Sequence, residues 1–454
     1  MTIASGIFRQ NDIRGIVGQD LTDEASHGIG RAYAALLGDR GVRGSVAVGR
    51  DNRPSGTKLR DALVAGLTEG GVDVVDIGVV PTPLLYWSLF NLGVAGGIQI
   101  TGSHNPAEYN GFKLCLGTES LHGHDIRELY ARIAAPAVSP TGRVRTEDVI
   151  DRYVADVVAR IGRISRPVRV VYDCGNGAAA LVAPQLFRAF GLDAVGLFAE
   201  SDGTFPNHHP DPTVPENLED LIGAVQREGA ELGIAFDGDA DRIGLVDEAG
   251  RIIWGDHLLI LYARDLFART GAGSPVIFDV KCSQALPDAI EKAGGTPVMW
   301  KTGHSLIKGK MKELRAPLAG EMSGHMFFAD GYYGYDDALY GAARLLRLVA
   351  DAGRSVRELL ADVPEFVSTP EIRVDCGDDV KFDLVDRAVA HFRARRDVID
   401  VDGVRVLFGD GWGLIRASNT QPILVTRFEA RSNARLAEIR AEMEGWLREQ
   451  GVTV

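Results

Sequence analysis

The sequence predicts an α/β protein: three similar α/β domains with mixed, largely parallel sheets, followed by a smaller α+β domain. Three segments repeat a β-α-β-α-β order, and a polar loop follows the third strand of each repeat. From about Glu365 the pattern changes to short strands, a hairpin turn and helices. We therefore expect domains over residues 1–145, 146–254, 255–365 and 366–454.

The first strand of each repeat is an apolar run that ends in aspartate. These runs are residues 45–51, 168–173 and 275–279. Each is followed by a stretch with apolar residues spaced for one helical face, which ends at glycine and leads to a second strand. The second strands are predicted at residues 72–77, 194–198 and 297–300. Strands that alternate with helices in this way form largely parallel sheets.

The loops after the third strands carry the unusual residues. They are residues 101–106, 237–242 and 320–325. Open α/β sheets bind ligands at the carboxyl ends of their strands. Because the loops recur at the same place in each repeat, we expect them to meet in one shared site.

The last segment is predicted to be an antiparallel α+β unit. Its elements are a strand at 371–376, a helix at 382–395, a hairpin turning at Asp402-Gly403, strands ending at 415 and spanning 423–428, and a final helix. The loop at 416–422 lies between two of these strands. Its arginine, hydroxyls, amide and backbone N–H groups could cradle a phosphate, or they could form a local Asx or ST turn.

Composition limits the classes of function. The chain has 454 residues, 45% hydrophobic and 24% charged, with a formal net charge of −13. An acidic chain disfavours nucleic acid and anionic membranes as partners, but a local cationic cleft could still take a phosphorylated small molecule. Four separated cysteines without a CxxC pattern fit reduced thiols. No signal pattern or apolar run of membrane-spanning length occurs, so we expect a cytoplasmic protein.

Ser103 is the candidate nucleophile. It lies in Thr101-Gly102-Ser103-His104-Asn105-Pro106, directly after a predicted buried strand, and Lys113 follows a few residues later. A hydroxyl with cationic neighbours suits attack on a phosphoryl group, or its storage. The alternative is a polar loop whose side chains satisfy the local backbone.

Asp237, Asp239 and Asp241 form the candidate metal site. Two unit charges about 4 Å apart repel by roughly 4 kcal/mol at an effective dielectric near 20, so such a cluster calls for a cation, and hard oxygen ligands favour Mg²⁺. An EF-hand is rejected because Arg242 stands where that loop needs glycine and the flanks are strands. A solvated acidic turn is the remaining alternative.

Further polar residues gather on the other loops. In the third loop Glu321, Ser323 and His325 could bind a metal, cap a helix or bind sugar hydroxyls. The remaining candidates are cationic or hydrogen-bonding residues near these loops: Arg14, Lys281, His304, Arg416, Ser418, Asn419, Thr420 and Arg427. A competing dinucleotide fingerprint, residues 175–180 with Glu200 downstream, also follows a strand, but hydride transfer needs no D-x-D-x-D cluster.

Taken in order, the four loops and the opening Asp12-Ile13-Arg14-Gly15 resemble the signature motifs of the α-D-phosphohexomutases, in particular the bacterial phosphomannomutase/phosphoglucomutase branch. The resemblance spans nearly the whole chain. It implies a four-domain, heart-shaped enzyme with a central cleft that acts on phosphorylated hexoses. It also implies Mg²⁺ as cofactor and a hexose 1,6-bisphosphate as activator and intermediate. We expect a monomer or weak homo-oligomer.

The resemblance also assigns roles to residues. It implies that Ser103 carries the phosphoryl group and binds Mg²⁺ together with Asp237, Asp239 and Asp241. It implies that Lys113 and Arg14 handle the proton of the reacting hydroxyl, with His104 beside them. The implied substrate contacts are Glu321, Ser323 and His325 to sugar hydroxyls, Arg416, Ser418, Asn419, Thr420 and Arg427 around the distal phosphate, and Arg242, Lys281 and His304.

Three residues depart from the family pattern, one of them Gly56, which follows Ser55 where a second serine is usual. Asn11 stands where tyrosine is usual, which puts one sugar contact in doubt, and Ala240 replaces a common glycine. Two alternatives stay open at this point. One is phosphoglucosamine mutase, which a coupled assay with glucosamine 6-phosphate distinguishes. The other is a non-catalytic sugar-phosphate-binding homologue, which would bind substrate without turnover.

Overall fold

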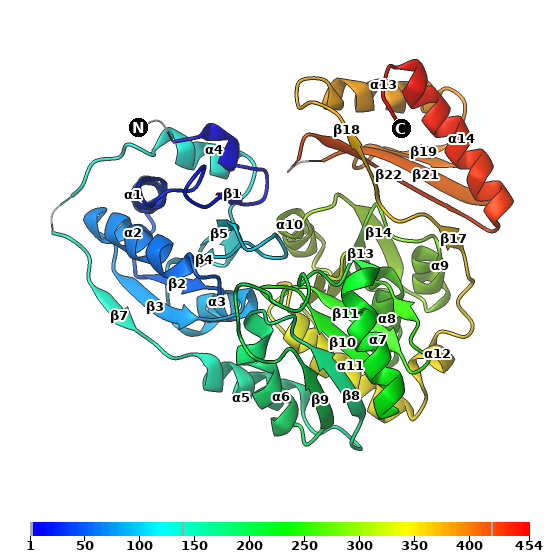
Figure 1. Cartoon of the computed structure of the whole chain (residues 1–454), viewed down its shortest axis with the longest axis horizontal. Helices are drawn as coiled ribbons and strands as arrows, with labels where there is room; N and C mark the ends of the chain where they lie inside the picture. The colour runs from blue at the N-terminus through cyan, green and yellow to red at the C-terminus, as the bar shows by residue number, and fades with distance from the viewer. Residues whose placement is uncertain (1–2, 139, 419–420) are drawn as a thin grey trace.

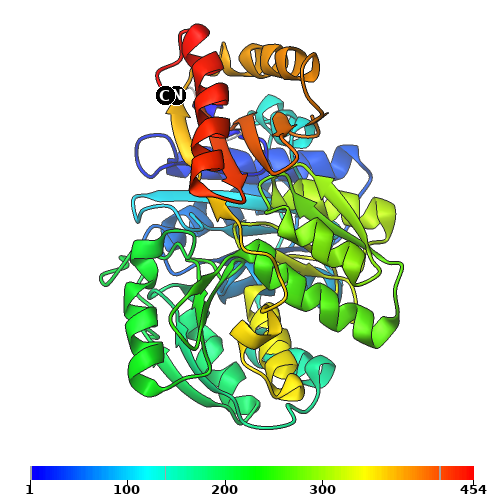
Figure 2. The ribbon, with the colours of Figure 1, turned by 90° about the vertical axis from the view of Figure 1, so that its right-hand side faces the viewer.

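The computed structural model describes residues 3–138, 140–418 and 421–454. The chain forms four units, each built on one β-sheet (Figure 1). The first unit, in blue and cyan, lies beside the second and third, in green and yellow. The fourth unit, in orange and red, lies over the third, and it keeps that position in the turned view (Figure 2).

The first unit has a seven-stranded sheet in the order β1-β5-β4-β2-β3-β7, with β6 paired to β5. Its strands are β1 (Ile13–Ile16), β2 (Val46–Arg50), β3 (Val74–Val79), β4 (Gly96–Ile100), β5 (Tyr109–Leu116), β6 (Glu119–Ser120) and β7 (Val144–Thr146). Its helices are η1 (Ser5–Ile7), α1 (Asp23–Asp39), α2 (Gly56–Glu69), α3 (Thr82–Asn91) and α4 (His124–Ala131).

The second unit has a five-stranded sheet in the order β12-β11-β10-β8-β9. Its strands are β8 (Arg169–Asp173), β9 (Asp193–Leu197), β10 (Leu232–Phe236), β11 (Ile243–Asp247) and β12 (Ile252–Ile253). Its helices are α5 (Ile150–Ile161), η2 (Ala178–Leu181), α6 (Ala183–Ala189), η3 (Pro215–Leu218) and α7 (Glu219–Glu228).

The third unit has a four-stranded sheet in the order β14-β13-β15-β16. Its strands are β13 (Pro275–Asp279), β14 (Thr296–Trp300), β15 (Leu318–Gly320) and β16 (Met326–Phe328). Its helices are α8 (Gly255–Thr270), α9 (Ala285–Lys292), α10 (His304–Leu314), α11 (Ala338–Ala352) and α12 (Val356–Leu359).

The repeat expected from the sequence is confirmed by the strand order. In each of the three sheets the first strand of the repeat lies between the second and third, and these pairs are parallel. The third strand then turns directly into an antiparallel neighbour. The polar loop of each repeat is this turn, so its short length keeps its side chains at the carboxyl edge of the parallel strands. The sheets are therefore mixed.

The fourth unit is wholly antiparallel, in the order β17-β22-β21-β20-β19 with β18 paired to β22. Its strands are β17 (Val367–Ser368), β18 (Ile372–Asp375), β19 (Val398–Ile399), β20 (Val404–Leu407), β21 (Gly411–Ala417) and β22 (Ile423–Ala430). Its helices are α13 (Lys381–Arg393) and α14 (Asn433–Glu449). The predicted hairpin at Asp402-Gly403 joins β19 to β20.

The hydrophobic cores explain how the units are held together. One buried cluster runs through the first three units, with contributions from α3, α5, α8 and α11. The fourth unit has its own core under α13 and α14, and it meets the third through a small cluster of Val280, Trp412 and Leu414. Within the described residues, no helix is both long enough and apolar enough to cross a membrane. The residues at which one domain passes to the next stay predictions.

Candidate active site

Ser103 lies in the turn between β4 and β5, and its backbone is in the left-handed region, with a φ of +50°. L-residues rarely adopt this conformation because Cβ crowds the backbone. Thr101 Oγ1 accepts the Ser103 N–H at 2.8 Å. Gly102 is required for close approach, since a Cβ there would lie 2.5 Å from Arg53 Cζ. The positive φ thus falls on the serine itself, which the sequence does not reveal.

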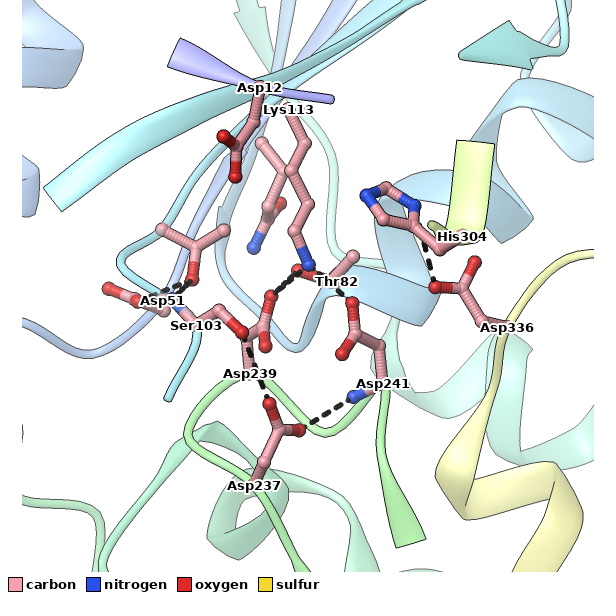
Figure 3. A network of polar contacts seen from close by, with 12 residues as sticks. Asp12, Asp51, Thr82, Ser103, Lys113, Asp237, Asp239, Asp241, His304 and Asp336 are labelled. Carbon is pink, nitrogen blue, oxygen red and sulfur yellow. Dashed lines mark hydrogen bonds and ion pairs between the residues drawn. The ribbon is translucent and has the colours of Figure 1, made fainter. Parts of the chain in front are cut away.

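The Ser103 hydroxyl lies against the acidic loop of the second unit. Its Oγ is 3.2 Å from Asp237 Oδ2 (Figure 3). The same Oγ is 3.0 Å from His104 Nδ1. Burial and then the nearby cations of Arg242 and Arg14 hold the pKa of His104 well below its usual range. His104 is therefore a neutral imidazole beside the hydroxyl at physiological pH.

Asp237, Asp239 and Asp241 are fully buried, and their ligand oxygens all lie within 4.8 Å of one another. Asp237 Oδ1 accepts the backbone N–H groups of Asp241 at 3.0 Å and Arg242 at 3.1 Å. Burial, followed by the carboxylates of Asp239 and Asp241, raises the pKa of Asp237 well above its usual range.

The donor set of this triad fits a hard divalent cation. Asp239 Oδ1 and Asp241 Oδ1 are buried oxygens without a hydrogen-bond partner, and a buried carboxylate oxygen left unpaired is costly unless a cation compensates it. Oxygen-only ligands are those that Mg²⁺ prefers. The triad expected from the sequence is thus brought together, with Ser103 at its edge.

Lys113, on β5, enters the same cluster. Its Nζ lies 2.7 Å from Asp239 Oδ2 and also contacts Asp241 Oδ2 (Figure 3). Burial disfavours the charged ammonium, but the two carboxylates outweigh it and raise the pKa of Lys113 above its usual range. Thr82 Oγ1, at the start of α3, donates to Asp239 Oδ2 at 2.5 Å. Lys113 is therefore a fixed positive charge.

The backbone of the acidic loop is held by helices from three units. Its successive carbonyls accept N–H groups from the first residues of η2, α3 and α11. The bonds are Ala178 N to Gly238 O at 2.9 Å, Thr82 N to Asp239 O at 2.9 Å and Ala338 N to Ala240 O at 3.3 Å. Helices of the first three units therefore all donate hydrogen bonds to the backbone of this one loop.

Arg14 lies at the mouth of the Ser103 loop, on β1. Its Nη1 donates to Asn105 Oδ1 at 3.0 Å, and its Nη2 contacts Asp12. The side chain is 21% exposed. The structure thus places Arg14 beside the Ser103 loop, where it can meet an incoming anion.

The third loop is joined to the acidic loop. Arg242 Nε donates to His325 Nε2 at 2.9 Å, and the two residues also form a backbone bridge. Glu321 Oε1 accepts the N–H of Gly303 at 2.6 Å, and Ser323 Oγ lies 3.4 Å from Glu321 Oε2. Burial raises the pKa of Glu321. All the residues predicted from this loop therefore lie together.

Asp336 is a site residue that the sequence analysis missed. It is fully buried, and its Oδ2 lies 3.1 Å from His325 Nδ1. His304 Nδ1 lies 3.7 Å from the same oxygen (Figure 3). The rings of His304 and His325 stack with centroids 5.6 Å apart. Burial, followed by Lys308, holds the pKa of His304 well below its usual range. An acidic pair directly before a helix, Asp336-Asp337, is the sequence signal that could have found it.

The arginines predicted as phosphate contacts in the fourth unit, Arg416 and Arg427, already have partners, either within the fourth unit or in the third. Arg416 Nε donates to Asp402 Oδ2 at 2.9 Å. Arg427 is buried, and its Nη1 donates to the carbonyl of Lys281 and contacts Met322 Sδ. Lys281 Nζ reaches back to Glu371 Oε1 at 2.6 Å.

The rest of the predicted phosphate loop is described only in part. Ser418 Oγ accepts the N–H of Gln421 at 3.1 Å, while the predicted residues Asn419 and Thr420 lie outside the described residues.

Comparison with known proteins covers nearly the whole chain. The family described as phosphoglucomutase/phosphomannomutase matches it with alpha/beta/alpha domain I at residues 5–137, domain II at 151–250, domain III at 254–366 and the C-terminal domain at 371–445. A phosphomannomutase/phosphoglucomutase of Pseudomonas putida is 47% identical over 440 residues, which cover 96% of this chain and 94% of that protein.

More distant and structural relatives agree. A probable phosphoglucosamine mutase of Methanopyrus kandleri is 36% identical, over 96% of each chain. The crystal structure of a phosphoglucomutase/phosphomannomutase family protein from Burkholderia thailandensis has a TM-score of 0.91 and 44% identity, over 98% of each chain. The chain described here therefore belongs to the phosphoglucomutase/phosphomannomutase family.

Proposed function

We propose that this enzyme interconverts the 1-phosphate and 6-phosphate of a hexose, mannose and/or glucose, through phospho-Ser103 and a hexose 1,6-bisphosphate. The observation that carries the proposal is the 3.2 Å approach of Ser103 Oγ to Asp237 Oδ2, two residues 134 positions apart in the sequence. A hydroxyl at the edge of a buried three-carboxylate cluster suits reversible phosphoryl transfer, because that reaction depends on positioning and on charge neutralisation.

Asp237, Asp239, Asp241 and an oxygen of the phosphorylated Ser103 would hold Mg²⁺. When bound, Mg²⁺ would neutralise charge on the transferring phosphoryl group. The chain's own contribution is a rigid cradle: Asp237 is fixed by two backbone N–H groups, and the loop carbonyls are fixed by three helix starts. The carboxylates therefore need little reorganisation at the moment of reaction.

In the forward step the free O6 or O1 of the sugar attacks phosphorus, and the bond from phosphorus to Ser103 Oγ breaks. The attacking hydroxyl loses its proton and the released Ser103 Oγ takes one up, so the step ends with a neutral serine hydroxyl. Lys113, whose Nζ lies 2.7 Å from Asp239 Oδ2, is proposed to assist this proton loss with its positive charge. Arg14 is placed at the loop mouth to contribute a second positive charge, and neutral His104 lies beside the serine oxygen.

The bisphosphate must then turn, because only one of its phosphates can face Ser103. Arg416, Ser418 and the loop beyond them are proposed to hold the other phosphate, with Lys281 and Arg427 at the junction behind them. Glu321, Ser323, His325, His304 and Arg242 are proposed to bind the sugar. If those groups hold hydroxyls other than that on C2, mannose and glucose are poorly distinguished, since neither epimer leaves a buried group unpaired.

A coupled assay with glucose 1-phosphate and mannose 1-phosphate, each with a trace of the 1,6-bisphosphate, tests the proposal. We expect turnover of both sugars that is lost on chelation and restored by Mg²⁺. The 36% identity to a probable phosphoglucosamine mutase makes glucosamine 6-phosphate the competing substrate. Preference for the aminosugar would assign the chain to that activity, and binding without turnover would make it a non-catalytic homologue.

A further inference from the structure

Arg53, in the turn after β2, holds the whole Ser103 loop. Its side chain is fully buried, and it uses all five of its N–H donors. Nε donates to Asp51 Oδ2 at 3.1 Å. The other four bonds go to backbone carbonyls of the loop: Ser103 at 2.7 Å, Asn105 at 2.6 Å, Pro106 at 2.6 Å and Tyr109 at 3.0 Å. The position of this guanidinium therefore sets the position of the nucleophile's backbone.

The face of the guanidinium is covered from another unit. Phe205, in the loop after β9, places its ring centroid 5.0 Å from Arg53 Cζ. The loop comes so close that a Cβ on Gly203 would lie 2.2 Å from the carbonyl oxygen of Asn52. An aromatic face on a buried arginine attracts its charge and excludes water without competing for its donors.

Phe205 is also strained. Its φ is +52°, a conformation that is unfavourable for an L-residue because Cβ crowds the backbone. Its N–H donates to Asp202 O at 3.0 Å, and Thr204 binds Asp202 Oδ1 through both N–H and hydroxyl. Such strain persists where the surroundings impose a geometry, and it concentrates at functional sites. Here it aims the ring at Arg53.

We propose that Phe205 is a positioning residue for phosphoryl transfer, acting through Arg53 on Ser103. The second unit then contacts the Ser103 loop in two ways. Asp237 binds the Ser103 hydroxyl, and Phe205 packs on Arg53, which binds the backbone carbonyl of Ser103. The inference rests on the proposed role of Ser103 as phosphoryl carrier.

The test replaces the ring and keeps an apolar side chain, with Phe205→Leu and Phe205→Met, and restores the ring with Phe205→Tyr. We expect kcat to fall about tenfold in Leu and Met variants that remain folded, because small misplacements of reacting groups are costly. KM should stay within twofold, and Phe205→Tyr should recover most of the rate. Amide hydrogen exchange of residues 103–109 should accelerate in the Leu and Met variants only.

Asn52→Ala is the matched control. Asn52 Nδ2 joins the same two units, donating to Asn176 O at 2.7 Å and Ser201 Oγ at 2.9 Å, without touching the guanidinium. Wild-type kcat and exchange in Phe205→Leu would overturn the proposal, and so would an equal loss of kcat in Asn52→Ala. If the wild type never turns over a hexose phosphate, the proposed function fails, but exchange of the loop still tests the Phe205 contact.

Discussion

Arg242 Nε, from the acidic loop, donates a hydrogen bond to His325 Nε2, from the third loop, across 2.9 Å. Arginine Nε always carries hydrogen, so Nε2 of the histidine must accept. In a neutral ring the proton then lies on Nδ1, which faces Asp336 Oδ2 at 3.1 Å and Asp241 Oδ1 at 3.5 Å. The two loops therefore fix both the orientation and the tautomer of His325.

Asp336→Asn should therefore lower kcat about tenfold or more, because the amide no longer favours a proton on Nδ1 or holds the ring by charge. KM for the sugar phosphate should change little. Lys308→Met is the control, since Lys308 contacts the other carboxylate oxygen of Asp336, at 3.1 Å. Steady-state kinetics decide: kcat in Asp336→Asn equal to that of Lys308→Met would argue against this role of Asp336.

Gly238→Ala should strongly reduce activity. A Cβ at this position would lie 2.4 Å from the Ser103 carbonyl oxygen, so either Ser103 or the acidic loop must move. We expect kcat to fall about 100-fold. Gly309→Ala is the matched control. Gly309 is exposed to solvent in the middle of α10, and a Cβ there would meet nothing within 4 Å. The control substitution should raise stability by about 1 kcal/mol and leave kcat unchanged. Chemical denaturation and steady-state kinetics measure both variants. An equal loss of kcat in the two would contradict a specific role for the contact between Gly238 and Ser103.

Asp237→Asn should separate stability from metal binding. The pKa of Asp237 is raised by burial and by its carboxylate neighbours, so its charged form opposes folding. In chelator the Asn variant should be as stable as the wild type, or more stable by about 1–2 kcal/mol. Added Mg²⁺ should raise the melting temperature of the wild type but not that of the variant. A full Mg²⁺ shift in the variant would mean that the ion binds elsewhere.

The Lys281–Glu371 pair should make the docking of the fourth unit sensitive to acid. Burial opposes the charged carboxylate, but Lys281 outweighs it and lowers the pKa of Glu371 from 4.5 to about 2. A lowered pKa in the folded state means that stability is present above about pH 4.5 and is lost as pH falls towards 2. The shift corresponds to about 3 kcal/mol.

Glu371→Gln should remove this part of the pH dependence and leave the rest of the acid transition in place. Chemical unfolding of the wild type and variant at pH 5, 4 and 3 measures the difference. The two curves should be farthest apart at pH 5 and converge at low pH. A constant separation across that range would contradict the assignment.

The architecture and the acidic triad could be predicted because their signals are local. Apolar runs that end in aspartate predict the repeated strands. Carboxylates at the alternate positions 237, 239 and 241 predict a cation site from one short segment. The predicted residues of the first three loops lie together for the same reason: each follows the third strand of its repeat.

What the sequence did not reveal are contacts between separate elements, some of them in different units. Arg53 and Phe205 are 152 positions apart and meet only because two units pack together. Asp336 gains its role from His325 on another element. Arg427 was predicted beside the distal phosphate, and the structure commits its Nη1 to the Lys281 carbonyl. Every residue has a backbone carbonyl, so the spacing of residue types in the sequence cannot predict which carbonyl an arginine will bind.

The most direct test of the account is the intact mass of the enzyme before and after incubation with glucose 1,6-bisphosphate, for wild type and Ser103→Ala, followed by peptide mapping. We expect the wild type to gain one phosphoryl group on the peptide that contains Ser103, and the variant to gain none. A phosphoryl group that still appears in Ser103→Ala would place the acceptor elsewhere and contradict the central claim.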